Sequence, residues 1–299
     1  MKAKMYFLLS MIIFGAVGIF AKYISLDSCQ IAFFLSLIGS LFLLGIILYQ
    51  KHKIPYKVIK KNLFLLSTAS IALSGNWIFL FQAYKKTTIA NAALSYYMAP
   101  ILVILIAPLI LHEKFSLKKM LCTCTSLLGL FLILEKGLTG NASDSFTGIL
   151  YGLIAAAFYA ALTIINKLIQ NLDGLINTCT QLLMAAILLA AYMPLSGTNW
   201  GTPGTTNDVL LLLVLGICHG GIGFYLFFTG MQALDGQSIA LLSYVDPLTS
   251  IFLSVLCLGE PMALQQYLGI FLLFGSIWIA EKEKPKHSYA ADSDISPSA

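Results

Sequence analysis

Long apolar runs separated by short polar connections dominate this sequence. Hydrophobic residues make up 59% of the 299 residues and charged residues only 10%, whereas soluble domains have about 25% charged residues. A membrane-spanning helix needs about 20 mostly apolar residues. Ten runs match or approach this length: 5–23, 29–49, 62–84, 90–111, 119–134, 146–168, 175–195, 208–233, 238–258 and 263–280. The pattern predicts an all-α polytopic membrane protein with ten transmembrane helices.

The basic residues, all of them lysines, are distributed unevenly between the connections. If the N-terminus is cytoplasmic, 14 lysines lie on the cytoplasmic side of the ten predicted helices and 4 lie on the other side. Cytoplasmic connections of membrane proteins carry an excess of lysine and arginine. The distribution therefore predicts that both termini are cytoplasmic, and it explains the net charge of +5 without a nucleic-acid partner. The polar segment 281–299 is predicted to be a disordered cytoplasmic tail.

The six cysteines lie in or beside the apolar runs, where thiols behave as small buried hydrophobic groups. Cys122 and Cys124 are two positions apart on a predicted helix and point to different faces, which argues against a metal site. The sequence thus predicts neither a disulfide framework, nor a metal, nor a cofactor.

An internal repeat relates the two halves of the chain. Tyr97-x-x-Pro100 followed by Glu113 matches Tyr244-x-x-Pro247 followed by Glu260, and both intervals from proline to glutamate are 13 residues. The repeat predicts two five-helix units, 1–137 and 138–280, and its tenth helix supports the short fifth run. Because five is an odd number, the second unit inserts upside down, as in many secondary transporters that work by alternating access. The alternative is a duplication that only built a stable bundle.

Asp246 is the clearest functional candidate, because placing an ionisable group at bilayer depth costs free energy. It directly precedes Pro247, and a proline frees a backbone carbonyl and bends or breaks its helix, as does Pro100 in the first unit. Asp246 is interpreted as a proton-coupling group or as the partner of a cationic substrate. The alternative is a carboxyl group that is satisfied within the bundle or faces a wet vestibule.

Several other polar and aromatic side chains are candidates for lining a substrate site. His219 lies near the middle of its predicted helix and titrates near physiological pH when unperturbed; the alternative is a packing histidine. Tyr97 and Tyr244 occupy equivalent places beside the two prolines. The remaining candidates are Asn76, Trp77, Tyr96, Tyr159 and Tyr225.

Glu113 and Glu260 fall where the chain leaves the hydrocarbon. We expect each of these carboxylates to cap the helix that follows it, 119–134 or 263–280, or to close a gate, rather than to bind substrate.

The stretch from Gln82 through Tyr97 and Pro100 to Glu113, and the stretch from Leu242 through Pro247 to Glu260-Pro261, resemble the bacterial EamA-like branch of the drug/metabolite transporter superfamily. The resemblance extends over the chain up to about residue 280. It implies a carrier in the bacterial cytoplasmic (inner) membrane for amino acids or related metabolites, often an exporter. The pattern of that family does not encode the substrate.

The sequence therefore predicts a secondary active transporter of small metabolites in a lipid bilayer, with protons or an exchanged solute as coupling partners. An uncoupled channel or facilitator is the main alternative. An intramembrane enzyme is disfavoured, because the sequence contains none of the common hydrolase, zinc-protease or phosphate-binding motifs. Substrate identity, transport direction and the choice between monomer and homodimer stay open.

Overall fold

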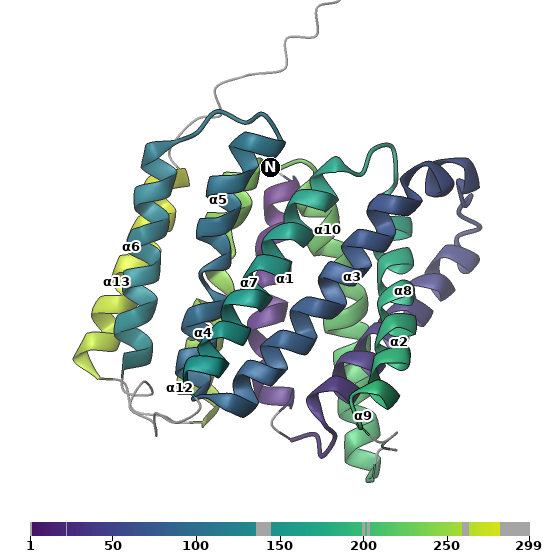
Figure 1. The fold of residues 1–299 in the computed structure, drawn as a ribbon, viewed down its shortest axis with the longest axis horizontal. Helices are drawn as coiled ribbons and strands as arrows, with labels where there is room; N and C mark the ends of the chain where they lie inside the picture. Colours follow the sequence, from purple (N-terminus) through teal and green to yellow (C-terminus); the bar gives the residue numbers. More distant parts are fainter. Residues whose placement is uncertain are drawn as a thin grey trace, which may run out of the picture.

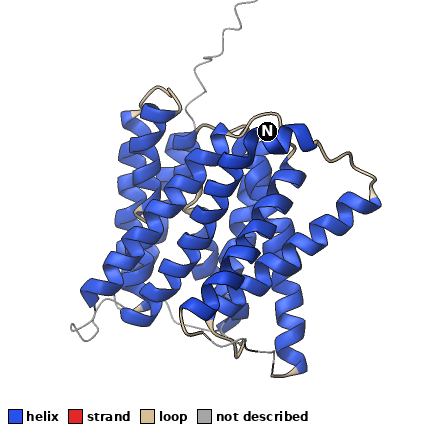
Figure 2. Ribbon diagram, turned by 45° about the vertical axis from the view of Figure 1, so that its right-hand side comes forward, coloured by secondary structure: helices blue, strands red, loops and turns tan. Residues whose placement is uncertain are grey.

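A computed structural model describes residues 2–21, 23–135, 145–198, 201, 204–258 and 263–281 of the chain. Within these ranges all regular structure is helical and there is no strand (Figure 2). Glu260 and Pro261, together with the predicted tail from 282 onward, lie outside the described residues.

The described helices are α1 (Lys2–Ala21), α2 (Ser28–Tyr49), α3 (Tyr56–Lys86), α4 (Ile89–Tyr96), α5 (Ala99–Ile110), α6 (Leu117–Leu134), α7 (Ser145–Leu168), α8 (Gly174–Leu195), α9 (Thr206–Val214), the π-helix η2 (Leu215–Gly223), α10 (Phe224–Gln232), α11 (Gly236–Leu242), α12 (Val245–Leu258) and α13 (Leu264–Glu281).

Each predicted apolar run falls on one of these helices or on a set of consecutive helices. By length and composition, seven described helical stretches are suited to cross a membrane: Cys29–Tyr49, Tyr56–Lys86, Ala90–Ile110, Leu117–Leu134, Phe146–Leu168, Gly174–Leu195 and Thr206–Gln232. Leu264–Ala280 is a shorter apolar helix. The multi-pass, all-helical architecture is therefore confirmed, while the count of ten crossings stays a prediction.

Polar side chains just before the helices set several of their starting points. Asp27, Ser116, Asp173 and Thr205 each accept a hydrogen bond from a backbone N–H in the first turn of α2, α6, α8 and α9. Such caps satisfy N–H groups that have no partner inside the helix. The short connections between apolar runs therefore also fix where these four helices begin.

Two of the apolar runs are interrupted helices. The first is broken at Tyr97 and Met98, between α4 and α5, and the second at Ser243 and Tyr244, between α11 and α12. Pro100 and Pro247 lie in the first turns of α5 and α12. A proline is tolerated there because the N–H groups of a first turn have no helical partner in any case.

The helices pack in pairs that are distant in sequence. α6 lies beside α13 at one side of the bundle, and α2 packs along α8 at the opposite side (Figure 1). Between these pairs, α3 packs along α7, and α1 packs against α10 and α12. The start of α1 and the end of α13 lie at the same end of the bundle, at the top of Figure 1.

The contact between α6 and α13 is made by backbone as well as side chains. A Cβ atom added at Gly269 would collide with the carbonyl oxygen of Gly129. Nearby, the buried hydroxyl groups of Ser126 and Ser276 are 2.6 Å apart and hydrogen-bonded. Small residues allow transmembrane helices to approach closely, so van der Waals contact and a polar pair stabilise this interface.

A buried amide cluster joins α7 to α8. Asn177 donates to the side-chain oxygen of Asn166 (3.1 Å), and Gln181 donates to the side-chain oxygens of both Asn166 and Asn177 (2.7 and 2.8 Å). All three side chains are at most 1% exposed. The cluster satisfies polar groups that neither lipid nor water reaches.

Of the described cysteine side chains, three are packed inside the bundle and two lie on its surface. Cys29, Cys122 and Cys179 are buried, but Cys124 and Cys218 are exposed on the outside of the bundle. Cys122 and Cys124 do point to different faces of α6, as their spacing requires.

The close contact of Gly269 makes a testable prediction. Gly269→Ala should destabilise the protein by about 1–3 kcal/mol, the usual cost of overpacking, because the added methyl group collides with the backbone of α6. Gly275→Ala on the same helix is the matched control, since a Cβ atom there has no neighbour within 4 Å. Thermal unfolding in detergent should show a lower midpoint for Gly269→Ala alone; equal midpoints would contradict the close packing.

Candidate functional site

Asp246 lies just after the second helix interruption, in the first turn of α12. It is ten residues from the start of α11 at Gly236, near the middle of the predicted helix 238–258. Its side chain is half-buried. Among the described residues, no lysine or histidine forms an ion pair with it. The carboxyl group is therefore deep within the bundle without a matching positive charge.

The two helix interruptions meet at this depth. The Tyr97 side chain of the first interruption faces the Asp246 carboxyl group and lies within its hydrogen-bonding range. The Tyr244 hydroxyl group of the second interruption donates to the Tyr97 carbonyl oxygen at 3.1 Å. Because a broken helix leaves carbonyl groups without partners, this bond satisfies one that would otherwise be exposed. Tyr244 is fully buried, with its ring 6.3 Å from the ring of Tyr97.

Further polar side chains come from α3, α4 and α7. The ring of Tyr96 lies 5.4 Å from that of Tyr97 and 5.9 Å from that of Tyr159. The hydroxyl groups of Tyr159 and Ser243 are 3.0 Å apart and hydrogen-bonded. Asn76 donates to the Ala155 carbonyl oxygen at 2.9 Å, which fixes its amide against α7. The structure thus brings Asn76, Tyr96, Tyr97, Tyr159, Tyr244 and Asp246 together.

Tyr84 was not among the candidates predicted from the sequence. It lies in the last turns of α3, next to Lys85 and Lys86, where the lysines suggest a membrane interface. In the structure it comes within electrostatic range of the Asp246 carboxyl group, as do Tyr96, Tyr97 and Tyr159. Only the three-dimensional arrangement of α3 and α12 could reveal this proximity.

His219 belongs to a separate aromatic cluster. It lies in the π-helix η2, with its ring 4.5 Å from that of Phe14 and 5.5 Å from that of Phe224. Trp77 packs edge-on against Phe224 at 5.6 Å. The buried Nδ1 atom of His219 has no hydrogen-bond partner among the described residues. Phe227 connects the clusters, since its ring lies 5.5 Å from Phe14 and 6.2 Å from Tyr159.

Tyr225 has no ring contact with either cluster among the described residues. It is only partly buried on α10, near Asp173 and Tyr6. It is therefore not brought together with the other candidates of the predicted substrate site.

A network that we call the polar latch lies at the end of the bundle where α1 begins. It consists of Glu113, Lys119, Lys167, Asp235 and Gln237, from segments distant in sequence. The Gly236 N–H group donates to both carboxylate oxygens of Glu113 (2.8 and 2.9 Å). Gln237 bonds to the backbone on both sides of the turn before α6, accepting from Ser116 N–H and donating to the Lys114 carbonyl oxygen (both 2.8 Å).

The remaining members of the polar latch add charge complementarity. The Lys119 ammonium group lies 2.7 Å from the Asp235 carboxylate. The Lys167 ammonium group donates to the carbonyl oxygens of Gln232 and Leu234 at the end of α10, where a cation interacts favourably with the helix dipole. The latch therefore holds α11 and the end of α10 against α5, α6 and α7.

The prediction that Glu113 caps the helix after it is wrong. Ser116 already caps α6, by accepting from the Lys119 N–H group. Glu113 instead reaches across the bundle to the first residue of α11, where an anion is favoured by the exposed N–H groups. The spacing within the chain could not indicate this long-range partner. The matching prediction for Glu260 lies outside the described residues.

The electrostatics of the polar latch differ between its two carboxylates. Burial raises the pKa of Glu113, and the hydrogen bonds from Gly236 offset this only in part. Burial also acts to raise the pKa of Asp235, but the nearby Lys119 and the hydrogen bonds from Ser238 outweigh it, so the pKa lies below its ordinary value. Asp235 is thus held in its charged form.

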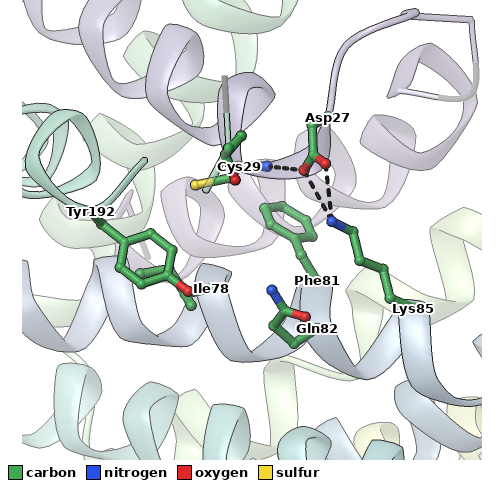
Figure 3. Close-up of a pocket in the computed structure, with 8 residues that line it drawn as sticks. Asp27, Cys29, Ile78, Phe81, Gln82, Lys85 and Tyr192 are labelled. Carbon is green, nitrogen blue, oxygen red and sulfur yellow. Dashed lines mark hydrogen bonds and ion pairs between the residues drawn. The ribbon is translucent and has the colours of Figure 1, made fainter. Parts of the chain in front are cut away.

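The opposite end of the bundle has a small polar pocket of about 20 Å³. Figure 3 shows Ile78, Phe81, Gln82 and Lys85 of α3 facing Asp27, Cys29 and Tyr192 across it. The Lys85 ammonium group pairs with the Asp27 carboxylate at 3.0 Å. Gln82 was noted in the sequence only as part of the repeat. The two ends of the bundle therefore carry different sets of polar contacts.

The described residues contain no group of three histidine, cysteine, aspartate or glutamate side chains placed to hold a metal ion. In the cluster around Asp246, the polar side chains are mostly phenols, amides and hydroxyl groups around one carboxyl group. Such a set can bind an organic solute by hydrogen bonding and ring contact.

Comparison with known proteins identifies similar chains over almost the full length. The model of the EamA-like transporter family matches residues 1–135 and 146–281. The uncharacterized transporter YxxF of Bacillus subtilis (strain 168) is 30% identical over 278 residues, which cover 90% of this chain and 86% of the relative. The S-adenosylmethionine uptake transporter of Rickettsia bellii (strain RML369-C) is 24% identical over 288 residues, 93% of each chain.

A solved crystal structure superposes on this chain with a TM-score of 0.81 and 19% sequence identity. The superposition covers 93% of this chain and 98% of the chain in that structure. At this identity the likeness shows the fold alone. The names of the family and of these relatives are those of transporters rather than of enzymes.

The polar latch makes a prediction about pH. Because the pKa of Asp235 is lowered in the folded protein, its charge stabilises the fold above the ordinary pKa of aspartate, and this is lost as the pH falls through the lower, folded-state value. Asp235→Ala should cost about 1–2 kcal/mol at pH 7, since both the helix cap and the ion pair disappear. The deficit should stay constant from pH 7 to pH 5 and shrink below the ordinary value of 3.8.

Asp235→Ser is the matched control, because serine retains the helix cap but not the charge. It should lose only the smaller, pH-dependent part of the stability in thermal unfolding at pH 7, 5 and 3.5. A deficit of Asp235→Ala that grows as the pH falls would contradict the assigned direction.

Proposed function

The chain belongs to the EamA-like transporter family, and from this premise we propose that it is a secondary transporter that moves small metabolites across the cytoplasmic membrane by alternating access. Multi-pass membrane transport is the property that the family and its relatives share. Amino acids and related compounds are the proposed substrate class. The relatives named for S-adenosylmethionine uptake make this amino-acid derivative a compound to test.

The proposed architecture is ten crossings in two inverted repeats, 1–137 and 138–280. Helix packing supports it, because the most extensive helix contacts of one half have counterparts in the other half. α3 packs along α7 as α10 packs along α1, and α4 and α5 pack on α7 as α12 packs on α1. α6 and α13 pair with each other, and so do α2 and α8, as expected about a two-fold axis. Two similar halves of opposite orientation can exchange their conformations.

The proposed substrate site is the cluster around Asp246 that includes Asn76, Tyr96, Tyr97 and Tyr159. The observation that supports it most directly is the half-buried carboxyl group beside two helix interruptions. Irregular backbone at membrane depth is tolerated only in protein or along a cavity, and transporters place their sites at such interruptions. His219 and Trp77, in the neighbouring aromatic cluster, are proposed to border the site. Tyr244 is proposed to position Tyr97 through its hydrogen bond.

The polar latch is proposed to be the cytoplasmic gate, with Glu113 as its central carboxylate. The lysine distribution, which favours cytoplasmic termini, supports this placement, because the latch lies at the end of the bundle where α1 begins. Opening this gate requires breaking the Gly236–Glu113 and Lys119–Asp235 contacts.

A vesicle experiment tests the proposed function. Radiolabelled amino acids, nucleosides and S-adenosylmethionine are screened in everted and right-side-out vesicles, and solutes that are taken up are then studied in proteoliposomes. A carrier predicts that unlabelled substrate on the trans side accelerates labelled uptake. An uncoupled facilitator shows no such counterflow, and that result would overturn alternating access.

Asp246→Asn makes the role of the carboxyl group testable. Losing a charge-assisted contact of about 1.5–3 kcal/mol should weaken uptake about 10- to 150-fold. If the carboxyl group couples transport to protons, the pH dependence of uptake should flatten as well. Asp246→Glu, which keeps the charge, should retain more uptake than Asp246→Asn. Unchanged affinity together with an unchanged pH profile in Asp246→Asn would remove Asp246 from the mechanism.

A further inference from the structure

Four tyrosines lie near Asp246, the carboxyl group of the proposed site. Tyr84, Tyr96, Tyr97 and Tyr159, here called the tyrosine cage, come from three parts of the chain: the end of α3, the first helix interruption, and α7. Their side chains all lie within electrostatic range of Asp246. The ring separations of 5.4 and 5.9 Å show that Tyr96 is in contact with two of the other rings.

The side chains of the tyrosine cage are accessible, whereas the neighbouring Tyr244 is not. Tyr84 is 37% exposed, and Tyr96, Tyr97, Tyr159 and Asp246 are half-buried, whereas Tyr244 is fully buried. Tyr159 is held in place by its hydrogen bond to Ser243, three residues before Asp246. The rings of the cage and the carboxyl group therefore offer free surface in a fixed arrangement.

The charge balance of this site is incomplete. The described residues provide no ion pair for Asp246, and an unpaired carboxylate at bilayer depth is unfavourable. A bound cation would supply the missing charge. The electron-rich faces of aromatic rings also attract cations, and aromatic cages recognise alkylated ammonium groups. A metal ion is a poor fit, since it needs several anionic or carbonyl ligands and the described residues hold no cluster of metal-binding side chains.

We propose that the substrate carries an alkylated ammonium or sulfonium group, and that this group binds against the rings of the tyrosine cage and pairs with Asp246. This inference rests on the proposed function, because it assigns a chemical class to the substrate of that site. A weakly hydrated onium group loses little solvation on entering an aromatic site, and its charge compensates the carboxylate. A neutral molecule of the same shape would fill the cage but would leave Asp246 without a countercharge.

Pairs of cations and neutral isosteres test this proposal on the purified full-length protein. The probes are choline with 3,3-dimethylbutan-1-ol, and S-methylmethionine with methionine; within each pair the molecules differ mainly in the onium charge. Thermal unfolding in detergent and a binding titration report on each probe. At least one cation should raise the unfolding midpoint and bind at least about tenfold more tightly than its isostere, as expected when ring and charge contacts both contribute.

Three variants connect such binding to the cage. Asp246→Asn should weaken binding of the cation at least about tenfold, and Tyr96→Leu should weaken it about fivefold. Tyr267→Leu is the matched control, because Tyr267 is 58% exposed on the outer face of α13; its affinity should equal that of the wild type. If a variant does not fold, the proposal is tested by comparing the affinities of the wild-type protein for each cation and its neutral isostere.

The proposal is overturned if no cation binds, if the neutral isosteres bind equally well, or if a folded Asp246→Asn protein keeps full affinity. The counterflow experiment separates this failure from failure of the proposed function. Counterflow of neutral or anionic solutes without cation binding would refute the cation site and leave the carrier. Cation binding without counterflow would support the site and refute the carrier.

Discussion

The hydrogen bond from the Tyr244 hydroxyl group to the Tyr97 carbonyl oxygen provides a partner for a backbone group where a helix is interrupted. In a bilayer, each backbone polar group must find a partner inside the protein. An unbroken helix meets this demand with its own backbone hydrogen bonds, but two helices of this protein are interrupted. Bringing the interruptions together, so that a side chain of one satisfies the backbone of the other, allows irregular structure in the middle of the bundle. Asp246 and Tyr97 can then face each other without leaving an exposed helix end.

Much of the fold could be predicted from the sequence because the lipid environment restricts the choices. The apolar runs predict the helices of the structure to within a few residues at most ends. The exception is α3, which begins at Tyr56, six residues before its apolar run, because a helix can extend into the polar interface with residues such as Lys57 and Lys60. The count of ten crossings and the inversion of the repeats stay predictions that the helix packing supports.

The site could be predicted only in part, and the missing part consists of long-range contacts. Tyr96, Tyr97, Tyr159 and Asp246 were identified by residue type and by their place near the two prolines. Tyr84 was missed because its neighbours Lys85 and Lys86 mark a helix end. Glu113 was assigned the wrong helix, since its partner Gly236 lies 123 residues away along the chain. Tyr225 carries a suitable side chain, but its face of α10 points elsewhere. Hydropathy and spacing contain no information about such pairings.

The amide cluster of Asn166, Asn177 and Gln181 also has a consequence for how the protein is made. If α7 and α8 were apart, the amides would lose the hydrogen bonds that join Asn166 to Asn177 and Gln181, and a buried polar group without a partner is unfavourable. The five residues between the two helices make them natural partners for a hairpin. Biogenesis is therefore favoured when α7 and α8 leave the insertion machinery as a preassembled pair. The rest of the bundle can then assemble around a hairpin whose register is already set by three side chains.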